Sequence, residues 1–364
     1  MSVDLKSLET DMTAWRRHIH QHPELGFHEQ ATVGFIIDLL ESFGVDEVHT
    51  GIGGTGIVAT IRAGTSDRAI GIRADIDALP MTELTESDHK SCTPGVMHAC
   101  GHDGHTTMLL GAAKQLAATR NFDGAVHLIF QPAEESLGYQ GPGGDPDGGA
   151  SAMIRDGLFD RFPMNAIFGI HNRPGIAAGK IAGRAGALYA AADKFEIVVT
   201  GKGGHAARPH LTIDPVLVAA QIIVAVQSIV ARSTDPMDAA VVSICKVEAG
   251  TAFNIIADEA RMGGTVRTLS RASQDATEQR LRDIVTGIAA WFGATAQLHY
   301  ERGYPALHNP ADLYAKVREV AIGIVGPDRF VDLDAPGMGG EDFARYLHVV
   351  PGCFLLLGNG DEGP

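Results

Sequence analysis

The chain has 364 residues, of which 45% are hydrophobic and 20% charged, a composition typical of soluble globular proteins. Its 44 acidic residues outnumber 29 lysines and arginines, and the net charge of −15 argues against nucleic acid or an anionic membrane as a partner. The length exceeds that of one compact domain, so we expect two domains.

The compartment is indicated by three further features. Four cysteines in so long a chain do not form a disulfide framework. The first residues lack the basic and then apolar order of a secretory signal peptide. The most apolar run, 216–230, contains polar residues and is expected to be too short to span a bilayer. We therefore expect a cytoplasmic protein.

The first part of the chain predicts helices over 5–20 and 29–43, followed by buried strands at 57–61, 69–74 and 124–130. The glycine pattern at 51–56 matches a dinucleotide-binding fingerprint, but β-branched residues follow it rather than a helix, so a turn before a strand is expected. The Gly-, Pro- and Asp-rich segment 138–149 lacks the Lys-Ser/Thr of a phosphate loop and is expected to be a mobile connection.

The stretch 97–105, Met-His-Ala-Cys-Gly-His-Asp-Gly-His, holds a thiol, imidazoles and a carboxylate with little apolar bulk. Buried polar groups are costly unless something binds them, so this composition indicates a metal site rather than a core segment. Cys100 and His102 are two residues apart, so in an extended or turning backbone both side chains can face one point. An amphipathic helical pattern follows Asp103, which places the site at a helix N-terminus.

Further polar side chains follow the ends of predicted strands. Glu134 and Glu135 come after the strand at 124–130, and two adjacent carboxylates suit a division in which one binds metal and the other moves a proton. A solvated acidic turn is the alternative for such a pair taken alone. The strand at 165–170 leads to His171, and a strand ending at 74 leads to Asp75 and Asp77. Carboxylates at the carboxyl ends of strands are typical of α/β active sites.

The pattern changes between 185 and 300. Strands are expected at 194–200, 240–247, 259–267 and just before Tyr300, with helices from Asp214-Pro215 to 231 and from Ser270 to 292. This β-α-β-β-α-β order is the ferredoxin-like pattern, and it is long enough to form a separate domain.

Five motifs in order carry a resemblance to a known family: residues 97–105, Gln-Pro-Ala-Glu-Glu at 131–135, His-Asn at 171–172, Gly-Gly-His-Ala-Ala-Arg-Pro-His at 203–210 and Met-Gly-Gly-Glu-Asp-Phe at 338–343. The sequence resembles the hippurate hydrolase and auxin–amino-acid conjugate hydrolase branch of the aminoacylase/carboxypeptidase dinuclear metallohydrolases. The resemblance implies an α/β fold in which a catalytic domain with a central mixed sheet flanked by helices (1–184 and 301–364) carries an inserted ferredoxin-like α+β lid and dimerisation domain (185–300).

The resemblance also implies the roles of individual residues. Cys100 would bridge two divalent metal ions (Zn, Mn, Ni or Co), His102, Glu135 and His171 would complete the ligands, and Glu134 would be the general base. Asp77 would orient a ligand from outside the metal shell. In the lid, His205 would stabilise the developing oxyanion, while Asn254 and Arg267 would contact substrate. Family members commonly form dimers through the lid, so we expect a homo-oligomer, a dimer or tetramer.

The family has one more histidine ligand after the strand that ends in Leu357-Gly358-Asn359, whereas here only Gly360 and residues 361–364 follow. We expect that this chain stops short of that ligand and holds its metal ions incompletely.

The leading hypothesis is a metal-dependent amidohydrolase that converts an N-acyl amino acid, for example an N-benzoyl or N-acetyl amino acid, to a carboxylic acid and a free amino acid. A second hypothesis is a hydrolase with Cys100 as nucleophile and His102 or His105 as base. A third is a non-catalytic metal- or ligand-binding protein of the same fold. The Glu134-Glu135 pair counts against the last two, since neither needs a spare carboxylate.

Overall fold

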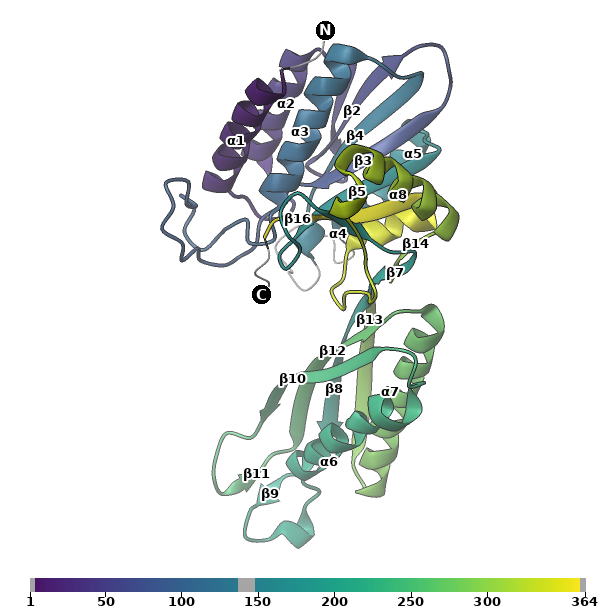
Figure 1. Ribbon diagram of the computed structural model, residues 1–364. Helices are drawn as coiled ribbons and strands as arrows, with labels where there is room; N and C mark the ends of the chain where they lie inside the picture. The colour runs from purple at the N-terminus through teal and green to yellow at the C-terminus, as the bar shows by residue number, and fades with distance from the viewer. Residues whose placement is uncertain (1–3, 137–147, 361–364) are drawn as a thin grey trace. The chain divides into compact units, whose positions relative to one another are not determined.

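The structure is a computed structural model that describes residues 4–136 and 148–360. The chain folds into two compact units. The first unit comprises Met1–Leu188, His308–Ala335 and Asp342–Pro364, and the second comprises Tyr189–Leu307 and Pro336–Glu341. The sequence did not indicate that the short segment 336–341 would join the second unit. Figure 1 shows the elements of each unit.

The first unit is built on a mixed sheet of eight strands in the order β1-β2-β4-β3-β5-β16-β6-β15. Its four central strands, β4, β3, β5 and β16, run parallel to one another. The strands are β1 (Glu47–Ile52), β2 (Gly56–Ala63), β3 (Ala69–Asp75), β4 (Gly124–Gln131), β5 (Ala166–Arg173), β6 (Ile181–Gly183), β15 (Phe330–Asp332) and β16 (Gly352–Gly358). The turn between β1 and β2 is the predicted one, so the glycine pattern at 51–56 forms no dinucleotide-binding helix start.

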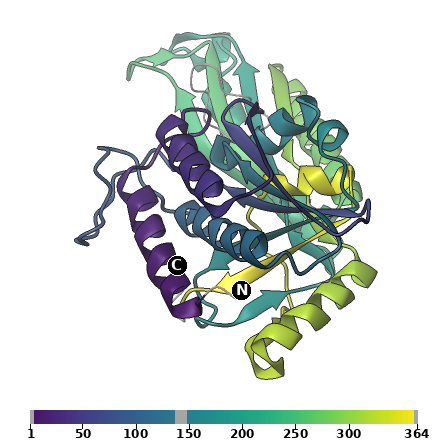
Figure 2. The same ribbon diagram turned by 90° about the horizontal axis from the view of Figure 1, so that it is seen from above.

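Helices cover this sheet. They are α1 (Leu5–Gln21), α2 (Gln30–Phe43), α3 (His102–Thr119), α4 (Gly148–Arg155), α5 (Leu158–Arg161) and α8 (Ala311–Val325). The helices α1, α2 and α3 lie together on one face, as Figures 1 and 2 show. Their apolar side chains pack on Val126, Leu128 and Phe130, which alternate along β4. The strand register pairs Asp75 with Gln131 and Gly358 with Arg173, so the strands of each pair end together.

The second unit has a four-stranded antiparallel sheet in the order β10-β12-β8-β13, with two helices packed on it. Its elements are β8 (Ala191–Thr200), β9 (Gly204–His205), α6 (Pro215–Ser228), β10 (Ala240–Ala249), β11 (Ile255–Ile256), β12 (Glu259–Thr268), α7 (Arg271–Trp291) and β13 (Thr295–Tyr304). This order of elements is the ferredoxin-like one that the sequence predicts. Two short strands, β7 (Gly186–Tyr189) and β14 (Leu307–Asn309), pair where the chain passes between the units.

We expected the apolar run 216–230 to be too short to span a bilayer, and this expectation is wrong. The helix α6 continues through a π-helical turn, so Pro215–Ser233 is long and apolar enough to span a membrane by length and composition. One face of this helix, with Val218, Ile222 and Val226, nevertheless packs into the core of the second unit. A core helix of a globular protein can have the same length and composition, so these two properties are weak evidence for a membrane span.

The segment 138–149 gives a partial correction. Its last two residues, Gly148 and Gly149, begin α4 rather than belonging to a connection. The remainder of the predicted mobile connection lies outside the described residues.

Candidate metal and catalytic site

The four parallel strands of the first unit end at one edge of the sheet, at Asp75, Gln131, Arg173 and Gly358. The loops after β3 and β4, the end of β5 and the start of α3 therefore meet there. Asp77 lies in the loop after β3, Glu134 in the turn after β4 and His171 near the end of β5. His102 is the first residue of α3, and Cys100 lies two residues before it. This is the edge at which ligands of α/β sheets generally bind.

A tight glycine turn brings Cys100 and His102 together. Gly101 has φ +88°, a left-handed conformation that favours glycine, and it precedes the first residue of α3. A Cβ at this position would lie 1.9 Å from Nδ2 of Asn172, so the turn also has no room for a side chain. The Asn172 amide donates to the carbonyl oxygen of Gly101 at 3.1 Å, which fixes the turn against β5.

His102 is held with one nitrogen facing the site. Its Nδ1–H donates to Asp77 Oδ1 at 3.0 Å, so Nε2 is the ring nitrogen that faces the site. The Nε2 atom is buried and has no hydrogen-bond partner within residues 4–136 and 148–360. It lies 3.7 Å from Asp75 Oδ2 and 4.0 Å from Glu135 Oε1. Asp77 therefore orients the ring from behind, as an outer-shell residue would.

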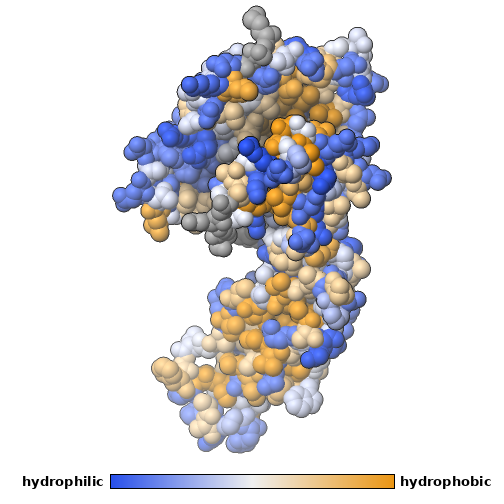
Figure 3. Space-filling view, in the orientation of Figure 1, coloured by the Kyte–Doolittle hydropathy of each residue, from blue (hydrophilic) through white to orange (hydrophobic). Residues whose placement is uncertain are grey.

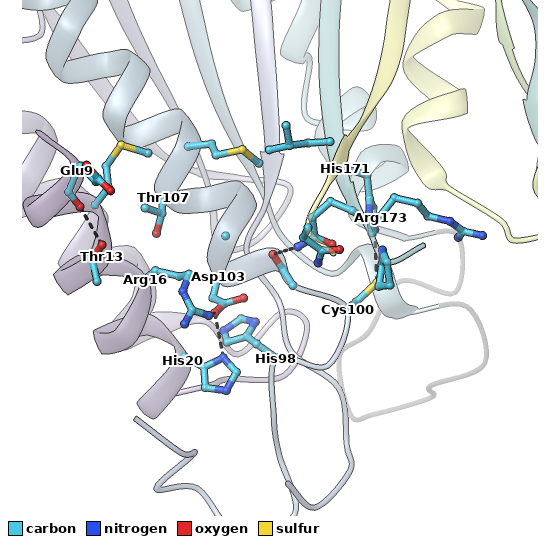
Figure 4. A pocket seen from close by; sticks show the side chains of 18 of the residues that line it. Glu9, Thr13, Arg16, His20, His98, Cys100, Asp103, Thr107, His171 and Arg173 are labelled. Carbon is cyan, nitrogen blue, oxygen red and sulfur yellow. Dashed lines mark hydrogen bonds and ion pairs between the residues drawn. The ribbon is translucent and has the colours of Figure 1, made fainter. Parts of the chain in front are cut away.

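Cys100 and His171 face each other from different elements, as Figure 4 shows. The Cys100 thiol lies 3.4 Å from His171 Nε2, while His171 Nδ1–H donates to the carbonyl oxygen of Asn172. Burial and the neighbouring His105 lower the pKa of His171 to about 3, so its ring is neutral and can act as a ligand. Burial raises the pKa of the Cys100 thiol, although His102 acts in the opposite direction.

The two glutamates follow β4 in a short 3-10 turn, Glu134–Ser136. Glu134 is buried, and its Oε1 accepts from the backbone N–H of Asp342 at 3.3 Å. Glu135 is partly exposed, and its backbone N–H donates to Asp77 Oδ2 at 2.9 Å. Asp77 thus contacts both a histidine and the backbone of a glutamate of the site.

A buried polar network lies beneath these glutamates. The Arg73 guanidinium donates to Asp75 Oδ2, Asp342 Oδ1 and Gln131 Oε1 at 2.8, 2.9 and 2.8 Å. Gln131 also donates to both oxygens of Asp342. The network joins β3, β4 and the segment after Glu341, so the backbone N–H that contacts Glu134 has a fixed position.

His105, which the sequence analysis considered only as a base for a Cys100 nucleophile, lies within the site and has a structural role there. Its Nδ1–H donates to Asp75 Oδ1 at 2.6 Å, and its Nε2 accepts from the backbone N–H of Asn172 at 2.9 Å. Both ring nitrogens are therefore hydrogen-bonded, so His105 links β3 to β5 rather than binding a metal ion. Its spacing of three residues from His102, on the same face of α3, is the signal that could have placed it here.

A cavity of about 900 Å³ adjoins Cys100 and His171. Figure 4 shows it between α1 and the start of α3, with Arg16, His20 and Asp103 at its wall. Asp103 accepts from Arg16 at 3.0 Å and from His20 at 2.9 Å. These contacts attach the N-terminus of α3 to α1. They could not be predicted from local sequence patterns, because they join residues more than 80 positions apart.

The candidate residues of the second unit form two separate groups. His205 is exposed on β9, which pairs with β11 beside Asn254, and the Asn254 carbonyl oxygen accepts from the N–H of Ala206. Arg267 lies near the other end of β12. Glu259 pairs with Thr200, whereas Arg267 pairs with Ala192, so at about 3.3 Å per residue the two ends of the strand are roughly 25 Å apart.

The donor set at the sheet edge fits metal ions. The ligand atoms of Cys100, His102 and His171 lie within 4.8 Å of one another, and so do those of His102, Glu134 and Glu135. Burial alone lowers the pKa of His102, but Asp75, Cys100 and Asp77 together raise it well above its ordinary value. The site therefore attracts positive charge at Nε2, which a divalent cation can supply.

Residues 71–364 match the model of the peptidase family M20/M25/M40. The chain belongs to this family. It is 43% identical over 356 residues to the IAA-amino acid hydrolase ILR1-like 2 of Arabidopsis thaliana, covering 96% of this chain and 77% of that protein. It is 40% identical over 359 residues to the hippurate hydrolase of Campylobacter jejuni, covering 99% and 91%.

The crystal structure of the Bacillus subtilis YXEP protein, described as a dinuclear metal binding peptidase from the M20 family, superposes with a TM-score of 0.83. It is 36% identical to this M20 chain and covers 98% of this chain and 90% of that one. The predicted family, α/β fold class and hydrolase class are thus confirmed, and the clusters of ligands fit two metal ions.

Proposed function

We propose that this M20 chain is a metal-dependent amidohydrolase that cleaves the amide bond of N-acyl amino acids, such as N-benzoyl or N-acetyl amino acids. The observation that carries the proposal is that two groups of candidate ligands, Cys100 with His171 and Glu134 with Glu135, both lie beside the buried ring of His102. Relatives named hippurate hydrolase and N-acetyl-L-cysteine deacetylase support the substrate class. We place the enzyme in the cytoplasm, with no nucleic acid or membrane as partner.

Cys100, His102, Glu135 and His171 would hold the two divalent ions, and Zn, Mn, Ni or Co suits these donors. When bound, such ions polarise the substrate carbonyl and lower the pKa of water toward roughly 7. Asp77 fixes the tautomer of His102 so that Nε2 is the donor atom, since Nδ1–H is used by the carboxylate.

Glu134 moves the proton. It takes a proton from the attacking water and returns it to the leaving nitrogen, which would otherwise depart as a poor leaving group. The backbone N–H of Asp342 donates to Glu134 Oε1 and so helps to fix the position of the carboxylate. Burial of Glu134 keeps solvent from competing for the proton.

The lid residues act on the substrate. His205 stabilises the developing oxyanion, Asn254 assists it, and Arg267 binds the carboxylate of the amino acid in the planar geometry that guanidinium allows. A small substrate cannot reach both ends of β12, which are roughly 25 Å apart. We therefore assign His205 and Arg267 of any one active site to two different copies of the chain.

A homodimer through the lid would satisfy this requirement. The side chains of Val216, Leu217 and Val224 are exposed along α6, and that of Val230 is exposed on the π-helical turn that follows it. The strand β10 lies at the edge of its sheet, with Val247 exposed. Figure 3 shows hydrophobic residues gathered on a face of the second unit. Edge strands and apolar helix faces of this kind are common sites of association.

The test is an assay of metal-loaded protein against benzoyl-, acetyl- and indoleacetyl-amino acids, with the released amino acid quantified. We expect hydrolysis that a chelator abolishes and added metal restores. Activity that survives chelation and is lost on alkylation would instead make Cys100 a nucleophile, a role that its raised pKa disfavours. Inertness toward the whole panel with metal bound would indicate a non-catalytic binding protein.

Light scattering after size-exclusion chromatography tests the dimer. Val224→Glu on α6 should yield monomers, whereas Val320→Glu, at a comparably exposed valine of α8 in the first unit, should not. Monomeric wild-type protein would contradict the lid interface.

A further inference from the structure

Glu29 directly precedes the first residue of α2, but its side chain does not cap the helix. It occupies the N-cap position of the helix, yet its side chain makes no capping hydrogen bond. The carboxylate of Glu24 does this instead, because it accepts from the backbone N–H groups of Ala31 and Thr32 at 3.1 and 2.8 Å. The fully buried side chain of Glu29 therefore serves another purpose.

The Glu29 carboxylate joins two loops of the first unit. Its Oε2 accepts from the hydroxyl of Thr55, in the turn between β1 and β2, at 2.5 Å. Its Oε1 accepts from the backbone N–H of Ala133 at 3.0 Å. Burying an acidic side chain costs free energy of desolvation. The two hydrogen bonds fix the position of the loop at Ala133, so we expect that loop position to have a role in the site.

Ala133 has an unusual backbone conformation. Its φ is +50°, in the left-handed region that residues with a Cβ rarely adopt. Neighbouring residues contact Ala133 on two sides. A Cβ on Gly26 would lie 2.8 Å from the Ala133 Cβ, and the Ala133 carbonyl oxygen accepts from the N–H of Gly149 at 3.0 Å. Such conformations persist where neighbouring groups hold them, and they cluster at functional sites.

The residues immediately after Ala133 are Glu134 and Glu135. A change of the backbone at Ala133 would swing both carboxylates, because each is attached within two residues of it. We propose that Glu29 is a positioning residue that holds Ala133 in its left-handed conformation and so aims Glu134 and Glu135 into the site. This inference rests on the proposed roles of the two glutamates.

The first test compares two substitutions at one position. Glu29→Ala removes both acceptors, and we expect kcat to fall by about 10–100-fold, the range seen when support outside the ligand shell is lost, with little change in KM. Glu29→Gln keeps an acceptor oxygen for Ala133 and supplies an amide N–H that can donate to the Thr55 oxygen. It should retain most of the wild-type kcat.

Glu24→Ala is the matched control. It removes the cap of α2 from the same short segment but leaves every contact of Ala133 in place. We expect a lower melting temperature and an unchanged kcat. A fall in kcat as large as that of Glu29→Ala would mean that destabilising α2 is enough, and the positioning role would be lost.

Amide hydrogen exchange on the metal-free protein decides the inference without any assay of activity. Exchange of the peptide that contains Ala133 should rise in Glu29→Ala and stay at the wild-type level in Glu29→Gln and Glu24→Ala. Unchanged exchange in Glu29→Ala would overturn the proposal. This readout also separates it from the proposed function, because it holds even if the N-acyl amino acid panel gives no hydrolysis.

Gly26→Ala provides a second variant if Glu29→Ala does not fold. The added methyl group meets Ala133 before any other residue, so it should displace the same loop with Glu29 intact. We expect increased exchange at Ala133 and a lower kcat. Wild-type values of both would show that the backbone of Ala133 does not set the position of the glutamates.

Discussion

In the first unit, His102, Asp77 and Glu134 are buried and each contacts another group of the site, whereas in the second unit His205 and Asn254 are exposed and Arg267 lies at the far end of its strand. The candidate metal-ligating side chains of the first unit are held in place by contacts with other protein groups. In the second unit, the hydrogen bonds of His205 and Arg267 are local: His205 Nδ1 accepts from the N–H of Ala207, and Arg267 donates to Thr265 and to the carbonyl oxygen of Val266. The difference supports the proposal that metal binding and proton transfer belong to the first unit, while recognition of the substrate depends on assembly.

The largest effect is expected at the proposed general base. Glu134→Gln keeps the size of the side chain and its contact with the Asp342 N–H but removes its basicity, so kcat should fall by about 10²–10⁴-fold. Metal content should stay at the wild-type level. The matched variant Glu135→Gln should lose metal as well as rate. A Glu134→Gln rate close to that of wild type would assign the proton transfer to another residue.

The division between the units is tested by mixing two inactive variants. His205→Ala should lower kcat/KM by about 10²-fold, a range typical for loss of one oxyanion donor, and Arg267→Ala should lower it through the loss of its charge-assisted contact with the substrate carboxylate. In a mixed dimer, one of the two sites would regain both residues, so a re-equilibrated 1:1 mixture should recover about a quarter of the wild-type rate. No recovery would mean that both residues act within one chain, and the strand separation would then have to be bridged by another movement.

Sequence reasoning found the parts of the site that are local in the chain. The spacing of Cys100 and His102, and the adjacency of Glu134 and Glu135, contain enough information to indicate a metal site. The family motif added His171 and the expectation for Asp77, whose contacts with His102 and the N–H of Glu135 the structure shows.

Contacts between distant segments were beyond the sequence. Glu29 reads as an ordinary residue before a helix, and nothing near it indicates a contact with Ala133, 104 positions later. The separation of His205 from Arg267 depends on the register of the strands. The alternation of apolar residues shows which face of a strand is buried, but it does not show which residues of two neighbouring strands are paired. The four-stranded order of the second unit was predictable because its elements repeat a common pattern, whereas the entry of 336–341 into that unit was not.

A smaller effect is expected outside the ligand shell. Asp77→Asn keeps the size of the side chain but can present an amide N–H where His102 Nδ1–H needs an acceptor, and it weakens the hydrogen bond from the Glu135 N–H. We expect metal affinity to fall by about 10–100-fold, measured by competition with a chromogenic chelator. Asp193→Asn, at a buried aspartate of the second unit, should leave metal affinity unchanged. Equal losses in both variants would show that the effect is one of general stability.

The smallest effect is on stability, and it distinguishes the buried acids of the two units. Asp193 in the second unit accepts from the Gln274 amide, the Tyr300 hydroxyl and the Gly303 N–H. Glu29 in the first unit has two donors, and burial together with the nearby Asp77 raises its pKa to about 7 from an ordinary value of 4.5. The folded protein therefore binds this proton more tightly than the unfolded chain does.

Because the folded pKa is the higher one, the stabilising contribution is complete below pH 4.5 and is lost as the pH rises toward 7. Between about pH 5 and 8, wild-type protein should lose roughly 2 kcal/mol of unfolding free energy relative to Glu29→Gln, which cannot ionise. Denaturant melts of metal-free protein at several pH values measure the difference. A gap between wild type and Glu29→Gln that stays constant with pH would mean that Glu29 is ionised throughout this range and that its two donors offset its burial.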